Sequence, residues 1–225
     1  MSQFLQFQIK SWLQDVVIPE GCLTISDDFG VQEISAKKLQ IGYYFGGYIS
    51  EIKNPSNFFI QLKSTEDQLN DLMDDLQDFY SDKILGLKYA IKKVGPGLLG
   101  LPVAAIYFDS KSKVNHGWHR GIVRKILGVQ EVNIFYCDYG STADVYLPYV
   151  RFLPKRFGTP NAQAIRVRLG GIIPKKTTGS GKEWSSSAIQ RFSGLVSYIF
   201  ISANYKLVIL HSNFSFRAKT FLKAF

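Results

Sequence analysis

The sequence predicts a mainly β fold with helices, of the α+β class. Short runs of aromatic and β-branched residues recur along the chain, separated by glycine, proline and asparagine, which is typical of strands joined by turns. One stretch, at about residues 65–82, instead repeats its apolar residues every three or four positions and predicts an amphipathic helix. With 46% hydrophobic and 20% charged residues, the 225-residue chain has enough apolar material for a sizeable core.

The N-terminal part is predicted to hold a lead-in segment and a hairpin. Residues 1–39 mix a short apolar stretch with turn-like segments, and we expect them to be weakly defined. Residues 42–52 and 58–62 are rich in aromatic and branched side chains, and the breaker Asn54-Pro55-Ser56-Asn57 lies between them. Two such runs around a breaker predict a hairpin.

The helix at about residues 65–82 has an apolar face and an acidic face. Its apolar positions recur at helical spacing, and Asp71, Asp74, Asp75 and Asp78 lie between them. We expect this acidic run to be a solvated helix face and not a metal site. Lysines follow it in a linker that ends in Gly95-Pro96-Gly97, where the turn residues exclude a continuing helix.

Residues 99–154 are predicted to form a small barrel of short strands with tight turns. The strands are expected at Val103–Phe108, Trp118–Ile126, Val132–Cys137 and Thr142–Leu147. A barrel of about 55 residues is too small to be very stable alone, so we expect the rest of the chain to support it.

The remaining chain is predicted to supply further strands and one helix. Residues 164–169 alternate apolar and basic side chains, which predicts a half-buried strand, and residues 177–182 read as a flexible loop. A helix is expected at 183–194. Three more strands are expected at Tyr198–Phe200, Tyr205–Leu210 and Phe214–Phe221.

The charge is distributed unevenly. The net charge is +9, but residues 1–98 contain 9 basic and 13 acidic residues, whereas residues 99–225 contain 18 and 5. A basic half of this kind could bind nucleic acid or an acidic partner, or it could simply be a soluble surface. The candidate contacts to phosphate or to an acidic partner are Lys155, Arg156, Arg166, Arg168, Lys175 and Lys176.

Catalytic and metal-binding patterns are missing from the sequence. The three histidines lie on separate segments, the two cysteines are not at metal-ligand spacing, and no phosphate loop or nucleophile elbow occurs. We therefore expect a non-catalytic binding module without cofactor or metal. No apolar run is long enough to span a membrane, and a secretory signal pattern is missing, so a cytoplasmic protein is expected.

Aromatic residues cluster on the predicted barrel. Side chains alternate across a strand, so Trp118 and His119 face opposite ways, as do Phe135 and Tyr136. We predict that Trp118 and Phe135 belong to the core and that Tyr136 and Tyr139 are at least partly accessible. Tyr107, His119, Tyr136 and Tyr139 could then form a box for a methylated cation. The alternative is that these aromatics fill the barrel core.

These segments carry a family resemblance. Residues 107–109, 118–123 (Trp-His-Arg-Gly-Ile-Val) and 135–141 (Phe-Tyr-Cys-Asp-Tyr-Gly-Ser) resemble the strands of a Tudor domain, with signatures W-Y-R-A-x-V and F-x-D-Y-G-N. The upstream hairpin and helix and the downstream residues 153–174 are similar to the extended Tudor family, and residues 47–58 resemble its Tejas-type members. The resemblance implies a Tudor barrel at 99–154, inserted into a staphylococcal-nuclease-like, oligonucleotide-binding-type part formed by 40–98 and 155–225. The helix at about 65–82 would link them.

The resemblance also implies a function. Extended Tudor domains bind arginine-methylated tails, especially those of Piwi-class Argonaute proteins, in cytoplasmic, perinuclear germ granules (nuage) of the piRNA pathway. The family's cage falls on Tyr107, His119, Tyr136, Tyr139 and Ser141, although His119 and Ser141 replace an aromatic residue and an asparagine. We therefore expect a non-catalytic adapter for arginine-containing peptides, dimethylated or not. An RNA-binding module and a structural oligomerisation domain are the alternatives.

Overall fold

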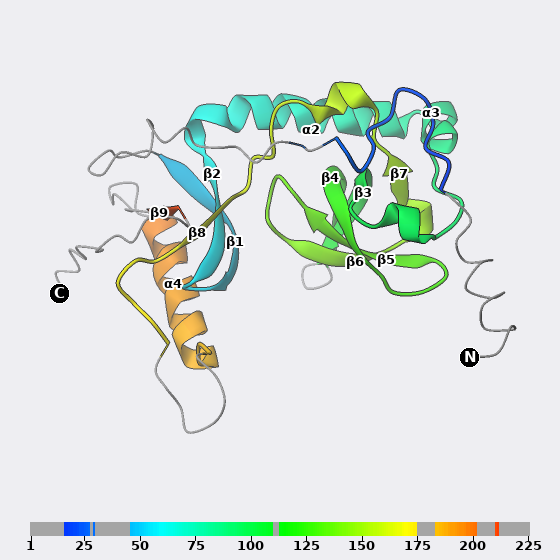
Figure 1. Cartoon of the computed structure of the whole chain (residues 1–225). Helices are drawn as coiled ribbons and strands as arrows, with labels where there is room; N and C mark the ends of the chain where they lie inside the picture. Colours follow the sequence, from blue (N-terminus) through cyan, green and yellow to red (C-terminus); the bar gives the residue numbers. More distant parts are fainter. Residues whose placement is uncertain are drawn as a thin grey trace, which may run out of the picture. The chain divides into compact units, whose positions relative to one another are not determined.

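The computed structural model describes residues 16–27, 29, 46–109, 113–174, 183–201 and 210–211. The chain divides into two compact units (Figure 1). Unit 1 comprises Met1–Val31 and Asp67–Gln163, and unit 2 comprises Gln32–Glu66 and Ala164–Phe225. The domain boundaries expected at 39/40, 98/99 and 154/155 stay predictions.

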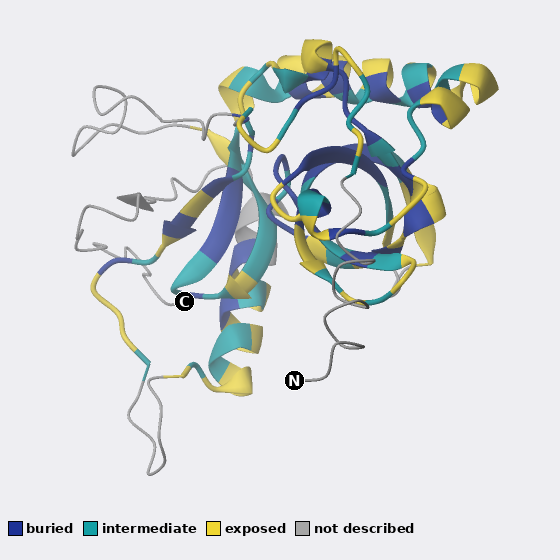
Figure 2. Ribbon diagram, turned by 45° about the vertical axis from the view of Figure 1, so that its right-hand side comes forward, coloured by how far each residue is buried: buried dark blue, intermediate teal, exposed yellow. Residues whose placement is uncertain are grey.

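Unit 1 is built on an antiparallel sheet that curves into a barrel. Its strands lie in the order β6-β5-β4-β3-β7, and the ring of strands is seen in Figure 2. The short 3₁₀ turn Leu147–Tyr149 leads from β6 to β7. The strands are β3 (Pro102–Asp109), β4 (Val114–Ile126), β5 (Glu131–Tyr136), β6 (Thr142–Tyr146) and β7 (Val150–Phe152). Four of them lie close to the predicted ranges, and β7 was not predicted.

The inner face of the barrel is filled by alternate side chains of these strands, as the two-residue period of a strand requires. Cross-strand pairing sets the register: Val123 pairs with Ile134, and Gly121 pairs with Tyr136. The core cluster on this face includes Val103, Ala105, Val123, Val132, Ile134, Tyr136, Val145, Val150 and Phe152. The small barrel therefore has a closed apolar interior.

A second core cluster covers the outer face of the barrel. Helix α2 (Glu66–Ser81), close to the predicted range, buries Leu72, Leu76 and Tyr80 against Trp118 and Ala104. The Tyr80 hydroxyl donates a hydrogen bond to the Phe152 carbonyl at 2.7 Å. The aspartates between these positions are exposed, as predicted for a solvated face. Both faces of the barrel wall are thus packed.

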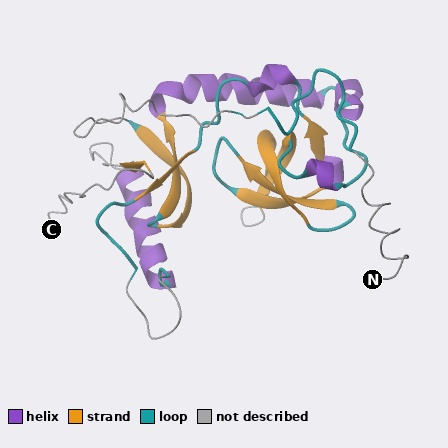
Figure 3. Cartoon of the chain, in the orientation of Figure 1, coloured by secondary structure: helices purple, strands orange, loops and turns teal. Residues whose placement is uncertain are grey.

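A short helix occupies part of the predicted linker. Helix α3 (Lys83–Lys88) follows α2 directly (Figure 3). The side chain of Asp82 caps it by accepting hydrogen bonds from the backbone N–H groups of Ile84 and Leu85 at 2.8 and 2.9 Å. The sequence predicts a linker here because a helix of six residues is too short to show a periodic pattern of apolar residues.

Gln77 of α2 closes a free edge of β4. Strand β5 pairs with β4 only from Gly121 onward, so the backbone of Trp118 has no strand on that side. The Gln77 amide fills the gap: its Nε2 donates to the Trp118 carbonyl at 2.7 Å, and its Oε1 accepts from the Trp118 N–H at 2.8 Å. A Cβ at Gly117, where φ is +83°, would collide with the same amide. The helix and the strand are therefore held in one register.

We expect Gln77→Ala to lower the free energy of unfolding by about 1–2 kcal/mol, because it leaves two partly buried backbone groups of Trp118 without their partners. Gln68→Ala is the matched control, since Gln68 is an exposed residue of the same helix and its replacement should change stability by less than about 0.5 kcal/mol. Urea unfolding of both variants measures the difference. Equal stabilities would show that the Gln77 amide does not hold the strand edge.

Unit 2 is a four-stranded sheet with a helix on one face. The sheet order is β1-β2-β8-β9, and the helix is α4 (Ser186–Ile201). Phe192 and Val196 of α4 pack on Phe58 and Ile60, and the Phe58 and Phe192 ring centroids are 5.1 Å apart. The strands are β1 (Gly47–Asn54), β2 (Asn57–Leu62), β8 (Ile165–Arg168) and β9 (Leu210–His211).

The prediction of a strand at Tyr198–Phe200 is wrong, because α4 continues through these residues. A short apolar run has the same pattern in a buried strand and in a buried helix, so composition could not separate them. Residues Leu210 and His211 form β9, whereas the rest of the predicted strands at 205–210 and 214–221 lies outside the described residues. None of the described helices is long and apolar enough to cross a membrane.

Candidate functional site

Aromatic side chains converge at one end of the barrel in unit 1. Tyr107 lies two residues before the end of β3, and Tyr136 is the last residue of β5. His119 of β4 pairs with Ala105 and lies on the same side of the strand as Gly121, the partner of Tyr136. Tyr139 follows in the turn toward β6. These inward positions at the strand ends bring four rings to the mouth of the barrel.

The rings meet mostly edge to face. The centroids of Tyr107 and Tyr136 are 5.0 Å apart, and those of His119 and Tyr139 are also 5.0 Å apart. The His119 centroid is also 6.1 Å from the centroids of both Tyr107 and Tyr136, so His119 contacts all three tyrosines. We call these four residues the ring cluster. Rings at this spacing are in edge-to-face contact, and a cation can lie over a ring face that the neighbouring rings do not cover.

A tight turn places Tyr139 on the rim. The Tyr136 carbonyl accepts hydrogen bonds from the N–H groups of Tyr139 and Gly140, and the Tyr136 N–H donates to the Ser141 carbonyl at 2.9 Å. Gly140 has φ of +83°, a conformation that favours glycine. Ser141, the fifth predicted site residue, is buried at the end of this turn. Backbone hydrogen bonds therefore hold the turn that carries Tyr139.

Three members of the ring cluster, His119, Tyr136 and Tyr139, are uncharged at physiological pH. Burial raises the pKa of Tyr139 to about 12 and raises the pKa of Tyr136 further. Burial also lowers the pKa of His119, against the opposing effects of its bond to Gly117 and of the nearby Asp138. Tyrosines that stay protonated and an imidazole that stays neutral are poor acids and bases near pH 7. The chemistry available here is binding of a cation and not proton transfer.

The predicted accessibility of these aromatics needs one correction. Trp118 is buried and Tyr139 is partly exposed, as predicted, while Phe135 is only partly buried. Tyr136, predicted to be accessible, is only 1% exposed, and its hydroxyl donates to the Ile106 carbonyl at 2.8 Å. The alternation was right, but Trp118 lies under α2 on the outer face, and Tyr136 lies inside the barrel.

His116 is a neighbour that the sequence pattern missed. Its imidazole is exposed, and its centroid lies 5.6 Å from that of Tyr107. The strand was predicted to begin at Trp118, whereas β4 begins at Val114, so His116 lies within it. Extending the predicted strand backward would have placed His116 opposite the end of β3. Among the described residues, no group of histidine, cysteine and acidic side chains could hold a metal ion.

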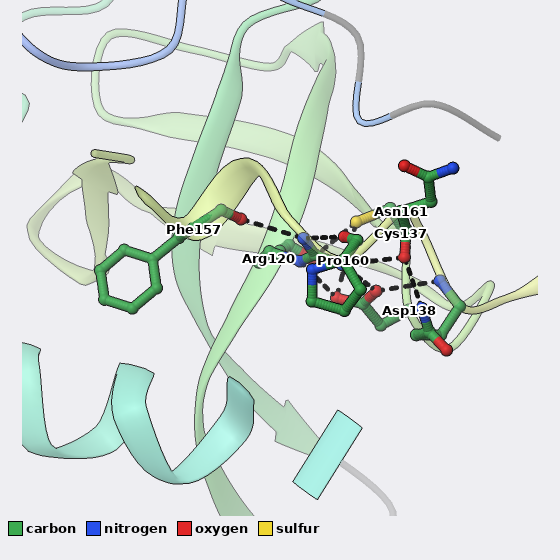
Figure 4. Close-up of polar contacts among 7 residues, drawn as sticks. Arg120, Cys137, Asp138, Phe157, Pro160 and Asn161 are labelled. Atoms are coloured by element: carbon green, nitrogen blue, oxygen red, sulfur yellow. Dashed lines mark hydrogen bonds and ion pairs between the residues drawn. The ribbon is translucent and has the colours of Figure 1, made fainter. Parts of the chain in front are cut away.

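The residues next to His119 and Tyr139 in the chain, Arg120 and Asp138, form a buried ion pair (Figure 4). Arg120, next to His119, donates from Nε and Nη2 to the two carboxylate oxygens of Asp138 at 2.9 and 2.6 Å, and both side chains are 0% exposed. Arg120 Nη1 also donates to the carbonyls of Phe157 and Pro160 at 2.9 and 2.7 Å. This network joins β4, the turn that carries Tyr139, and residues 157–163. It therefore fixes the backbone segments next to His119 and Tyr139.

The predicted basic contacts lie in both units. In unit 1, Lys155 and Arg156 are exposed, and the Arg156 guanidinium lies 4.5 Å from the Phe79 ring centroid. In unit 2, Arg166 and Arg168 point outward from β8 while Ile165 and Val167 are buried, as the alternation predicted. Lys175 and Lys176 lie outside the described residues. A single basic surface made of all six stays a prediction.

Comparison with known proteins decides the family. A family model for the Tudor domain matches residues 39–171, more than half of the chain. The chain belongs to the Tudor domain family. Tudor domain-containing protein 5 of Bos taurus is 30% identical over 154 residues, and Tudor domain-containing protein 1 of Mus musculus is 29% identical over 159 residues. These alignments cover 67% and 69% of this chain but only 14% and 12% of those proteins.

Solved extended Tudor domains have the same fold. That of Drosophila melanogaster Papi aligns with a TM-score of 0.60 at 20% identity, covering 69% of this chain and 76% of that one. The extended Tudor domain of BmPAPI in complex with sDMA aligns with a TM-score of 0.58 at 26% identity, with the same coverage. The prediction of an extended Tudor domain, mainly β with helices, is confirmed. The assignment of individual residues to a methylarginine cage stays a prediction.

Proposed function

We propose that this Tudor domain binds arginine-containing peptides, including dimethylated ones, through the ring cluster of Tyr107, His119, Tyr136 and Tyr139. The observation that carries the proposal is the convergence of these four rings, which are neutral and lie 5.0–6.1 Å apart at the barrel mouth. A guanidinium is flat, permanently charged and weakly hydrated, so aromatic faces suit it better than they suit an ammonium ion. Methylation adds apolar surface that the rings can cover.

The solved relatives support this class of ligand. The BmPAPI extended Tudor domain was solved with sDMA, and that of Drosophila Papi, carrying D287A, with a Piwi N-terminal R10me2s peptide. The same Papi variant was also solved with the unmethylated R10 peptide. The TD3 domain of mouse TDRD1 was solved with a MILI peptide that contains dimethylarginine 45. We extend this to a Piwi-class Argonaute tail, or another granule protein, as the partner.

The wider role that we propose is that of a non-catalytic adapter in the piRNA pathway. The curated relatives are Tudor domain-containing proteins. This chain spans only 14% and 12% of the length of the two that were compared above. A domain that holds a peptide tail through neutral rings, without a proton-transfer group, tethers its partner. Cytoplasmic germ granules are the location in which this tethering would operate.

The decisive test replaces Tyr139, a partly exposed ring of the cluster. We expect Tyr139→Ala to weaken the binding of a peptide with one symmetric dimethylarginine by about 2- to 30-fold, because a cation–π contact contributes about 0.5–2 kcal/mol. Stability should change little, since Tyr139 is partly exposed and its turn is held by backbone hydrogen bonds. Calorimetric titration of the 225-residue chain with this peptide gives the affinity, and a thermal melt checks the fold.

Tyr146→Ala is the matched control, because Tyr146 is a 60% exposed tyrosine of the same barrel that belongs to none of the ring contacts of the cluster. It should leave the affinity unchanged. Equal losses in the two variants, or no loss in Tyr139→Ala, would remove the ring cluster from the proposal. A wild-type chain that binds none of the arginine peptides would contradict the proposed function itself.

The salt dependence of the affinity distinguishes RNA binding through the basic half from peptide binding by the ring cluster. Contacts between phosphates and lysine or arginine release counterions, so affinity for single-stranded RNA should fall steeply with salt if Arg166 and Arg168 bind it. Arginine binding by neutral rings has a weaker salt dependence. Tight RNA binding that Arg166→Glu with Arg168→Glu abolishes, together with absent peptide binding, would favour the RNA-binding alternative.

A further inference from the structure

One nitrogen of the His119 imidazole already makes a hydrogen bond within the protein. Its Nδ1 lies 3.0 Å from the carbonyl oxygen of Gly117 on the same strand. A carbonyl oxygen only accepts hydrogen bonds, so Nδ1 carries the proton and donates it. In the neutral ring the other nitrogen, Nε2, then has no proton and holds a lone pair. The backbone of β4 therefore fixes the tautomer of this side chain.

The His119 ring lies within the ring cluster, with the centroids of the three tyrosine rings 5.0–6.1 Å from its own. Nε2 lies on the far edge of the imidazole from Cβ, and His119 is on the inward side of β4 with Gly121 and the Gly121 partner, Tyr136. The nearest ring, that of Tyr139, is tilted 64° to the imidazole. The Tyr136 hydroxyl is committed to the Ile106 carbonyl. Within the described part of the chain, the bond to Gly117 accounts for the hydrogen bonding of the His119 ring.

We propose that Nε2 of His119 accepts a hydrogen bond from an N–H of the bound guanidinium and thereby selects arginine derivatives over quaternary ammonium ions. This inference rests on the proposed function and names the cations that the same site accepts. Symmetric dimethylarginine keeps an N–H on each of its three nitrogens, so one can meet the lone pair while the methyl groups lie on the rings. Trimethyllysine has no N–H on its cationic group.

The preference for arginine derivatives over trimethyllysine follows from the free-energy cost of leaving the Nε2 acceptor of His119 without a donor. Rings alone accept a quaternary ammonium ion as readily as a guanidinium, because cation–π attraction is not directional at the cation. With His119 in the cluster, trimethyllysine would cover Nε2 without pairing it. A hydrogen bond to a charged donor, well placed, corresponds to a preference of about tenfold or more. Sites that hydrogen-bond their ligand reject analogues that lack the donor.

Acid should remove this preference. Protonated His119 would present an N–H in place of the lone pair and would repel the cation. The groups that face it are Asp138, which lies in the ion pair with Arg120, the exposed His116, and the three tyrosines. Tyr136 and Tyr139 stay neutral at this pH, and the neighbouring His116 lowers the pKa of His119. The pKa of His119 is lowered, so binding should persist through neutral pH and be lost on the acid side of the usual histidine range.

The test uses three peptides that differ only at the central residue: symmetric dimethylarginine, unmodified arginine and trimethyllysine. Affinities of the 225-residue chain are measured by fluorescence anisotropy at neutral pH, and the dimethylarginine titration is repeated at successively lower pH. The variants are His119→Phe, which keeps a ring and removes Nε2, and His116→Phe as the matched control. His119→Leu, which also lacks an acceptor, is made as well, so that the result does not depend on one variant folding.

We expect the wild type to prefer dimethylarginine over trimethyllysine by about tenfold or more, since one charged hydrogen bond separates them. His119→Phe should lose both this preference and most of the acid sensitivity, whereas His116→Phe should keep the preference. An unchanged preference in His119→Phe and His119→Leu would overturn the inference and leave the proposed function standing. Failure of the wild type to bind any of the three peptides would overturn both.

Discussion

Arg120→Ala is expected to lower the free energy of unfolding by about 3–5 kcal/mol, because removing one partner of a buried ion pair leaves the other charge uncompensated. The Asp138 carboxylate is 0% exposed and would lose both hydrogen bonds from Arg120, while it keeps those from the Gln163 N–H, at 3.0 Å, and from the weak Cys137 thiol. The carbonyls of Phe157 and Pro160 would also lose their donor. Urea unfolding measures the loss.

Arg120→Lys and Arg124→Ala give this experiment its controls. Lysine keeps the charge but cannot reach both carboxylate oxygens and the carbonyls at once, so its loss of stability should be smaller than that of alanine. Arg124 is an exposed residue of the same strand with its guanidinium 5.1 Å from the Phe135 ring, and its removal should cost about 1 kcal/mol or less. If Arg120→Ala were no less stable than Arg124→Ala, the ion pair would not hold the barrel unit together.

The strands of the barrel could be predicted from sequence because their signals are local. The two-residue alternation and the turn residues around residues 103–108 and 132–137 lie within the strands themselves. Strand β7 has only three residues, Val150–Phe152, and its pairing with Val103 to Ala105 joins parts of the chain far apart in sequence. No window of local sequence contains that information, so β7 could not be found this way.

The buried pair of Arg120 and Asp138 shows the same limit for side chains. The residues are 18 positions apart, and each looks like a surface charge when its own neighbours are considered. What determines their burial is the chain at 157–163, which covers them and supplies carbonyl acceptors. The sequence held one signal: Arg120 lies on the same face of its strand as the apolar residues Trp118 and Ile122. Charged residues in such positions are nearly always paired when buried.

The site residues show what alternation can and cannot determine. It correctly separated Trp118 from His119, and the observed register confirms that they face opposite sides of the strand. It could not show which side was closed, because both faces of this wall are packed: the inner one by the barrel and the outer one by α2. A barrel standing alone would have left the outer face to solvent. The predicted accessibility of Tyr136 was wrong because this residue faces the barrel interior, whereas helix α2 explains why Trp118, on the outer face, is buried as well.

Tyr136→Ala should consequently destabilise the chain about as much as Trp118→Ala does. Each change removes a large buried ring, and such truncations cost about 3–5 kcal/mol. The Tyr136 ring is 1% exposed within the barrel cluster, and Trp118 is packed between α2 and the barrel wall. Loss of peptide binding in Tyr136→Ala would thus report a damaged barrel and could not assign the residue to the site.

Tyr136→Phe resolves this difficulty, because it keeps the ring and removes only the hydroxyl that donates to the Ile106 carbonyl. We expect it to lose about 0.5–1.5 kcal/mol of stability, the usual net contribution of one hydrogen bond, and to bind the dimethylarginine peptide almost as tightly as the wild type. Urea unfolding of Tyr136→Ala, Tyr136→Phe and Trp118→Ala gives the order of stabilities. If Tyr136→Ala unfolded within about 1 kcal/mol of the wild type, the ring would not be part of the barrel core, because truncating a buried ring creates a cavity that costs more. Tyr136 would then belong with Tyr139 on the accessible rim.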